Sequence, residues 1–352
     1  MPVTAVDLFC GAGGLTRGLL DAGISVVAGI DFDINCKYAY EHNNGAKFVN
    51  ARIEEVSGAS ISSYYPDGTT KILVGCAPCQ PFSSHTNKYK KGQTAPRDER
   101  WFLLNHFSRL IRETNPDIVS MENVPQLSKQ TIFTEFVETL KSLNYKVSWS
   151  VVYCPDYGIP QKRNRLVLLA SKLGDITLIP ATHTSDNYLT VRSAIGNTPA
   201  IAAGEAHKTD PLHRSSRLNA LNLRRIKSSV PGGTWRDWAP ELRCSCHKKD
   251  SGSTYASVYA RMEWDQPSPT ITTEFYNYGT GRFGHPVQDR ALSLREGALL
   301  QTFPPTYEFL PTSEYSFKQV GKMIGNAVPV RLGEVIGKSI LAHLDERSSN
   351  NV

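Results

Sequence analysis

The chain has 352 residues, 40% of them hydrophobic and 20% charged, and a formal net charge of +6 at pH 7. Such a length can bury a large core and predicts one large and one small domain. The composition argues against a disordered or membrane-spanning protein, and the modest positive charge permits a polyanionic partner without requiring one. Seven scattered cysteines, and first residues without a signal-peptide pattern, predict a cytoplasmic protein with free thiols.

The first half of the chain alternates short apolar runs with amphipathic segments. Strands are predicted at residues 5–9, 25–28, 72–74, 118–120, 147–152 and 166–169. Apolar residues recurring on one helical face predict helices at residues 103–111 and 132–143, and the glycine-rich turn after the first strand is expected to open another that runs from residue 14 to about residue 23. This alternation predicts a mostly parallel sheet with helices on both faces, and such sheets bind ligands at the carboxyl ends of their strands.

The alternation ends near residue 181. From there to about residue 290 the chain is rich in Thr, Ser, Gly, Pro, His and basic residues. Helical order returns at Ser293, where Ser293 and Glu296 predict a capping box. A last helix is predicted after Pro329, with a frayed tail over residues 346–352. These changes predict domain boundaries near residues 184 and 290.

A glycine-rich turn follows the first predicted strand, in the segment Asp7-Leu-Phe-Cys-Gly-Ala-Gly-Gly14. Glycines let the backbone approach a ligand closely, although the spacing is not GxGxxG and a tight bend alone is an alternative. Asp31 ends the second strand, where an acidic residue can accept hydrogen bonds from ribose hydroxyls. The turn and the acid together predict a nucleoside cofactor.

Cys79 lies on a turn between Pro78 and Gln80, just beyond the end of a predicted strand. That position, with basic residues expected nearby, favours a thiolate nucleophile. The other lone cysteines of the alternating region are expected to be inert, small hydrophobic residues: Cys10, Cys36, Cys76 and Cys154.

Two more polar groups lie at strand ends. Glu122, followed by Asn123, could be a solvated surface acid, or a proton donor if its pKa is raised. Arg163 and Arg165 could form a basic edge, or a planar array of donors on one side of a strand. A thiol, a carboxylate and two arginines can together attack, protonate and hold a polar heterocycle.

Cys244, Cys246 and His247 are the one clustered Cys/His group in the sequence. A structural zinc site usually needs four ligands in two well-separated pairs. We therefore expect a loop here and no bound metal.

Several motifs occur together in a recognisable order: Asp7–Gly14, Asp31, Gly75–Ser83, Glu122–Val124, Gln161–Arg165, Arg290–Pro304 and Gly325–Val328. In this order they closely resemble the bacterial DNA cytosine-5 methyltransferases of restriction–modification systems. The resemblance implies an α/β fold, with a Rossmann-like S-adenosylmethionine-dependent methyltransferase sheet and a smaller irregular target-recognition domain. It implies a catalytic and cofactor-binding domain at residues 1–184, target recognition at 185–290, and a returning C-terminal segment at 291–352.

The resemblance also implies a reaction: Cys79 adds to C6 of a cytosine flipped out of duplex DNA, and C5 takes the methyl group of S-adenosyl-L-methionine at a specific short sequence. The implied catalytic residues are Cys79, Gln80, Glu122, Asn123, Arg163 and Arg165. The implied cofactor residues are Phe9, Gly11, Ala12, Gly13, Gly14, Asp31, Phe32, Ile53, Pro78, Asn326 and Ala327. Residues 83–100 resemble the family's mobile loop. Arg52 stands where the family usually has an acid beside the cofactor adenine, which leaves that contact open.

The implied partner is double-stranded DNA, with a cognate restriction endonuclease acting separately, no membrane, and a monomer acting on the bacterial nucleoid. An RNA cytosine methyltransferase of the same fold is an alternative, although the related tRNA enzyme lacks so large a recognition region. A DNA-binding protein that has lost catalysis is a third alternative. The presence of Cys79, Glu122, Arg163 and Arg165 argues against it. A dinucleotide oxidoreductase would leave the turn around Cys79 unexplained.

Overall fold

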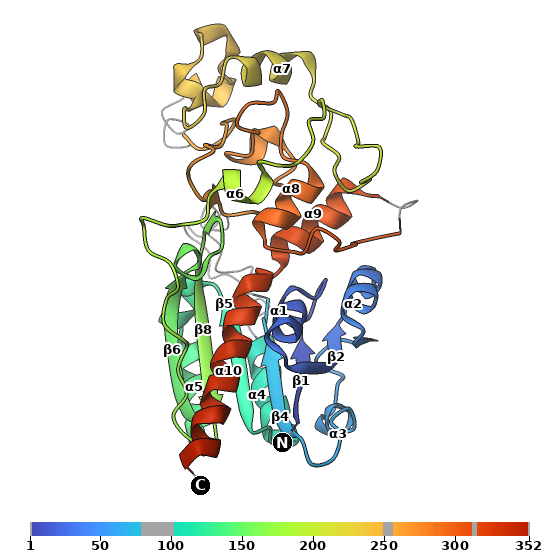
Figure 1. Ribbon diagram of the computed structural model, residues 1–352, viewed down its shortest axis with the longest axis vertical. Helices are drawn as coiled ribbons and strands as arrows, with labels where there is room; N and C mark the ends of the chain where they lie inside the picture. The colour runs from blue at the N-terminus through green and yellow to red at the C-terminus, as the bar shows by residue number, and fades with distance from the viewer. Residues whose placement is uncertain (1, 79–101, 249–255, 312–314, 351–352) are drawn as a thin grey trace, which may run out of the picture. The chain divides into compact units, whose positions relative to one another are not determined.

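A computed structural model gives the fold (Figure 1) and describes residues 2–78, 102–248, 256–311 and 315–350. The chain forms two compact units. The first comprises Met1–Tyr153, Asn164–Ala181 and Val328–Val352, and the second comprises Cys154–Arg163 and Thr182–Ala327. The functional domain boundaries at residues 184 and 290 stay predictions. Over the described ranges, every helix is too short or too polar to span a lipid bilayer.

The first unit is built on a seven-stranded sheet in the order β3-β2-β1-β4-β5-β8-β6. Its strands are β1 Val3–Leu8, β2 Ser25–Asp31, β3 Lys47–Asn50, β4 Thr70–Gly75, β5 Ile118–Asn123, β6 Lys146–Tyr153 and β8 Asn164–Ser171. Neighbours from β3 to β5 are parallel, whereas β8 is antiparallel to both β5 and β6. The predicted mostly parallel α/β sheet is confirmed. The apolar-run prediction missed β3 because that strand has four residues and polar ends.

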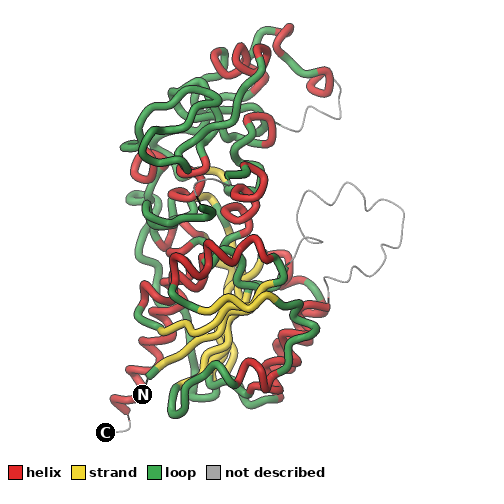
Figure 2. The backbone as a smooth tube through the Cα atoms, turned by 90° about the vertical axis from the view of Figure 1, so that its right-hand side faces the viewer, coloured by secondary structure: helices red, strands yellow, loops and turns green. Residues whose placement is uncertain are grey.

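Helices cover both faces of this sheet (Figure 2). On one face α1 Gly14–Ala22 contacts α2 Lys37–Asn44 and α10 Val330–Asn350. On the other, α4 Leu103–Thr114 contacts α3 Gly58–Ser62 and α5 Thr131–Ser142. Successive strand residues point to opposite faces, so alternate β1 side chains such as Val6 and Leu8 join the core beneath α4 and α5. The helices predicted near residues 14–23, 103–111 and 132–143 are confirmed.

Helix α10 returns the end of the chain to the first helix. Glycines allow the two backbones to meet: a Cβ added to Gly18 would lie 2.2 Å from the carbonyl oxygen of Val330. The helix continues to Asn350, so the prediction of a frayed tail from residue 346 is wrong for this stretch. The last turns are anchored because His343 Nε2 lies 2.9 Å from the Ser171 hydroxyl at the end of β8.

The second unit has little regular structure. Its elements are α6 Val191–Ile195, α7 Ala220–Lys227, α8 Leu294–Leu300, α9 Phe317–Asn326, and a two-stranded sheet of β7 Gln161–Lys162 and β9 Ser268–Pro269. The predicted capping box of Ser293 and Glu296 begins α8. Buried arginines hold the loops: Arg290 donates to both oxygens of Glu296 at 2.7 Å, and Arg261 donates to the carbonyl oxygens of Ile226 and Ser229. Guanidinium groups therefore replace the missing ladders of backbone hydrogen bonds.

The close approach of α1 and α10 gives a stability prediction. The variant Gly18→Val must push the helices apart, which should lower the free energy of unfolding by about 1–3 kcal/mol in urea titrations. The variant Ala342→Leu adds a larger side chain on the exposed side of α10 and serves as the matched control, with a change below about 0.5 kcal/mol. Equal stability of Gly18→Val and wild type would contradict the tight crossing.

Candidate active site

The polar groups of the first unit gather at one edge of its sheet. Parallel strands β1, β2, β4 and β5 all end at this edge, and antiparallel β8 begins there. The four strands end at Leu8, Asp31, Gly75 and Asn123. The residues just after these ends therefore lie near the first residues of β8. This edge is where sheets of this type bind ligands.

Glu122 is the central carboxylate of this edge and is only 2% exposed. The Cys76 thiol donates a hydrogen bond to its Oε2 at 2.7 Å, and Nε of Arg165 lies 2.8 Å from its Oε1. The strand register produces the second contact: Glu122 lies opposite Val167, so Arg165, two residues earlier on β8, projects from the same face. A buried carboxylate is stable only with such partners.

One oxygen of Glu122 keeps hydrogen-bonding capacity. Oε1 is buried and is close enough to Arg165 for an ion pair, yet within residues 2–78, 102–248, 256–311 and 315–350 it accepts no aligned hydrogen bond. A buried acceptor without an aligned donor costs free energy that a bound ligand can recover. The edge is therefore suited to a polar ligand that brings an N–H group.

Asn123 holds the turn after β4. Its side-chain nitrogen donates to the carbonyl oxygen of Ala77 at 3.1 Å, and its side-chain oxygen accepts from the backbone N–H of Val124 at 2.8 Å. The turn continues through Pro78. The next residues of the predicted site, Cys79 and Gln80, lie outside the described part of the chain, as does the predicted loop at residues 83–100.

The glycine turn after β1 is tied to the end of β2. Gly11 and Gly13 have φ of 51° and 89°, and Phe9 has φ of 59°, a left-handed conformation that few non-glycine residues adopt. The Asp31 carboxylate accepts hydrogen bonds from the backbone N–H groups of Gly11, at 2.9 Å, and Asp33, at 2.8 Å. Gly13 is the N-cap residue of α1 and provides no side-chain cap, so the turn presents backbone N–H groups at a helix N-terminus.

Large apolar side chains are exposed next to Asp31. Phe32 is 60% exposed and Ile34 is 53% exposed, whereas Ile53 is buried. Arg52, at the position where an acid was expected, is itself exposed and pairs with Glu54 at 3.3 Å. The surroundings of Asp31 thus combine a carboxylate with uncovered apolar surface.

Asp7 lies beneath the glycine turn and is fully buried. The Thr16 hydroxyl donates to it at 2.7 Å. Burial raises the pKa of Asp7 from 3.8 to about 7; the Thr16 hydrogen bond lowers it, and the neighbouring charge of Asp31 raises it further.

The second unit holds Arg163 in a separate network. Its guanidinium donates to the carbonyl oxygens of Ile271, at 3.2 Å, and Ala327, at 3.4 Å. Gln301 also donates to the Ala327 carbonyl oxygen, at 3.2 Å, and accepts from Gln161 at 2.8 Å. Together these side chains fix the backbone around Ala327, directly after α9.

Asn326 ends α9 and is exposed, whereas the preceding Gly325 is tightly enclosed. A Cβ on Gly325 would lie 2.4 Å from the backbone of Thr272 and Thr273, so the close approach requires glycine.

Two expectations change. Cys76 is not inert packing, because its thiol is bound to Glu122. Arg163 and Arg165 do not form one donor array on a strand: they have different partners, Arg163 in the second unit and Arg165 on Glu122. Gln301 lies within the motif Arg290–Pro304 but was not among the predicted site residues, because a lone glutamine beyond a capping box carries no signal of its own.

Comparisons with known proteins agree with this architecture. A solved structure of a prophage-encoded candidate DNA modification methyltransferase of E. coli superimposes with a TM-score of 0.75, at 21% identity, covering 97% of this chain and 99% of that one. Spodoptera frugiperda DNMT2 superimposes with a TM-score of 0.62, at 18% identity, covering 96% and 99%. The fold is that of the S-adenosylmethionine-dependent methyltransferases.

Sequence comparison then defines the family. The C-5 cytosine-specific DNA methylase family matches residues 3–342. The Type II methylase M.HgiDII of Herpetosiphon aurantiacus is 56% identical over 343 residues, covering 97% of this chain and 95% of the relative. The Type II methyltransferase M.PspPI of Psychrobacter sp. is 33% identical over 349 residues, covering 97% and 79%. The chain belongs to the C-5 cytosine-specific DNA methylase family and is a DNA cytosine-5 methyltransferase.

The buried ion pair gives a second prediction. In Arg165→Ala the Glu122 carboxylate keeps its burial and loses its cation, so the free energy of unfolding should fall by about 3–5 kcal/mol in urea titrations. Lys141→Ala breaks the exposed pair with Glu138 and should cost less than about 1 kcal/mol. Equal losses in the two variants would show that the Glu122 pair is not effectively buried.

The raised pKa of Asp7 gives a third prediction. The folded state binds this proton more tightly than the unfolded chain, so the contribution of Asp7 to the free energy of unfolding declines as pH rises from 3.8 to about 7 and is level above. Asp7→Asn should remove that decline, and Asp67→Asn, in an exposed turn, should keep it. Urea unfolding between about pH 5 and about pH 8 measures both. Parallel pH profiles for wild type and Asp7→Asn would refute the assignment.

Proposed function

We propose that this methyltransferase flips a cytosine out of duplex DNA, adds the Cys79 sulfur to C6 and methylates C5 at a specific short sequence. The main support for this proposal is the buried Glu122, which has one oxygen without an aligned hydrogen-bond donor. Glu122 lies at the same sheet edge as the turn that leads to Cys79. The Type II names of the relatives support a role in restriction–modification, in which methylation protects host DNA from a separately acting cognate endonuclease. We expect the enzyme to act as a monomer.

In this proposal S-adenosyl-L-methionine binds along the edge from β1 to β4. The turn formed by Phe9, Gly11, Ala12, Gly13 and Gly14 lets the backbone approach the cofactor, and Asp31 accepts hydrogen bonds from its ribose. The exposed Phe32 supports this placement, since a bound purine would cover it, with Ile53 and Pro78 contributing nearby. Asn326 and Ala327 would contact the methionine end. The bound cofactor supplies an electrophilic methyl group and leaves as S-adenosyl-L-homocysteine.

The residues at β5 and β8 would activate the base. Cytosine C5 is a poor nucleophile until the Cys79 thiolate adds to C6, which moves an electron pair to C5 as an enamine. Glu122 would accept a hydrogen bond from the N4 amino group, the donor that Oε1 lacks, and in its protonated form would transfer its proton to N3, which neutralises the negative charge that develops on the ring. Arg165 would hold the base O2.

The remaining residues would position the reacting groups. Asn123 fixes the turn before Cys79, and Arg163 braces the backbone around Ala327. Gln80 would contact the nucleic-acid backbone. After methyl transfer a base removes the C5 proton, and the electron pair that remains expels the Cys79 thiolate from C6.

Target recognition belongs, in this proposal, to residues 185–290. Arginines and lysines there would contact phosphates, and a few side chains would read base edges in the major groove. Flipping the base costs a few kcal/mol, and closure of the loop at residues 83–100 over the extruded cytosine would offset part of that cost.

A duplex with 5-fluorocytosine at the target position tests the covalent step. Fluorine at C5 blocks the final elimination, so wild type with S-adenosylmethionine should form an adduct that resists denaturation. Peptide mapping should place that adduct on Cys79. Cys79→Ala should form none, and Cys36→Ala, which alters a cysteine away from the strand end of β4, should form as much as wild type.

Two results would contradict the proposal. An adduct that maps to Cys76 would show that the nucleophile is not Cys79. Transfer of the labelled methyl group to tRNA rather than to duplex DNA would show that the substrate is RNA. Bisulfite sequencing of a plasmid from cells that express the protein reads out the methylated sequence directly.

A further inference from the structure

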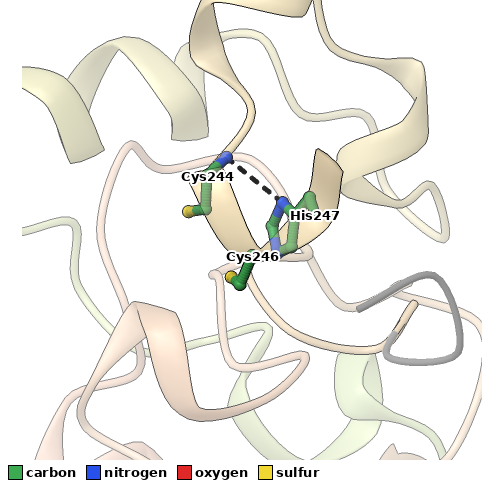
Figure 3. A group of neighbouring side chains, drawn as sticks. All are labelled: Cys244, Cys246 and His247. Atoms are coloured by element: carbon green, nitrogen blue, oxygen red, sulfur yellow. Dashed lines mark hydrogen bonds between the residues drawn. The ribbon is translucent and has the colours of Figure 1, made fainter. Parts of the chain in front are cut away.

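Cys244, Cys246 and His247 form a compact cluster in the second unit, outside the residues used above. They lie at and just before the 3-10 turn Ser245–Lys248, and their ligand atoms are all within 4.8 Å of one another (Figure 3). The sequence spacing alone favoured a metal-free loop. The fold instead brings two sulfurs and one imidazole together.

We propose that Cys244, Cys246 and His247 bind one Zn²⁺ ion. Thiolate and imidazole are the ligands that Zn²⁺ prefers, and a Zn²⁺ ion held by three protein ligands takes a water as its fourth ligand. At Zn–S distances of about 2.3 Å and Zn–N distances of about 2.0 Å, the ligand atoms lie about 3.5–3.8 Å apart. Cys246 is exposed and Cys244 is half-buried. In this proposal, rotation of their side chains closes the remaining gap.

The imidazole is held in place for this role. His247 is buried and stacks on Trp235, with ring centroids 4.1 Å apart and planes 15° from parallel. The backbone N–H of Cys244 donates to His247 Nδ1 at 3.4 Å, a long hydrogen bond that points the Nδ1 lone pair toward Cys244. Zn²⁺ at Nδ1 would replace this weak contact with a much stronger one.

The local charge also suits the ion. The guanidinium of Arg225 lies over the rings of Trp238, at 5.7 Å, and Tyr259, at 5.2 Å. Tyr259 in turn contacts His247 edge-on, at 6.0 Å between centroids. Two thiolates and one Zn²⁺ make a neutral group, so the ion adds no net charge beside this arginine.

The surroundings show what the ion would stabilise. Among the residues that the structure describes, six buried ones form a small core here: Ile226, Trp235, Trp238, Leu242, Tyr278 and Ala291. The segment from Trp235 to Lys248 contains only short 3-10 turns, Trp235–Asp237, Pro240–Leu242 and Ser245–Lys248. So small a core gains much from a metal cross-link, and binding of the ion is then coupled to folding of the segment.

The direct test is zinc content by mass spectrometry of the full-length protein purified without chelator. We expect about one Zn²⁺ per chain, and a loss of most of it in Cys246→Ser and His247→Asn. Ser245→Ala changes the exposed residue between the two cysteines and should keep the metal. Zinc that stays at one per chain in both ligand variants, or zinc absent from wild type, would overturn the site.

A second measurement covers the case in which a ligand variant does not fold. Co²⁺ added to metal-free wild type should give the visible bands of tetrahedral cobalt and a thiolate charge-transfer band, and Zn²⁺ should abolish both. Binding should also change the fluorescence of Trp235, which stacks on His247. A spectrum of octahedral cobalt without the thiolate band would contradict the proposal. Both readouts are independent of methyl transfer.

Discussion

The pairing of Glu122 with Arg165 is the interaction on which the active edge depends. A carboxylate that is 2% exposed would be unstable without a nearby cation, and the cation comes from the one antiparallel strand of the sheet. The reversed direction of β8 matters because it brings the start of that strand, rather than its end, to the edge where β1, β2, β4 and β5 finish. A parallel strand in the same place would put Arg165 at the opposite edge.

Arg165 lies close to the sequence boundary between the two units. The backbone passes from the second unit into β8 between Arg163 and Asn164. Arg163 is bound to carbonyl groups near α9, and Arg165, two residues on, is bound to Glu122. Two arginines that are close in sequence therefore act within different units, Arg163 in the second and Arg165 in the first.

Much of this arrangement could be predicted from the sequence. Strands β4 and β5 each contain a short apolar run, and Ser293 and Glu296 form the cap of α8, so local chemistry determines these elements. The motif order predicted the family, which the comparisons confirm. Long-range contacts could not be predicted in the same way. The Cys76 thiol reaches Glu122 across 46 positions, and Gln301 meets Gln161 across 140, so neither leaves a local pattern. Cys244, Cys246 and His247 are adjacent in sequence, but spacing does not show where side chains point.

The most direct test of the central claim is a double-mutant cycle on single-turnover methyl transfer, with Glu122→Gln, Arg165→Ala and the double variant. If the carboxylate and the guanidinium act as one unit on the extruded base, the double variant should be no slower than the slower single variant. If the two losses in rate multiply, each group acts alone, and the account of a coupled pair is wrong.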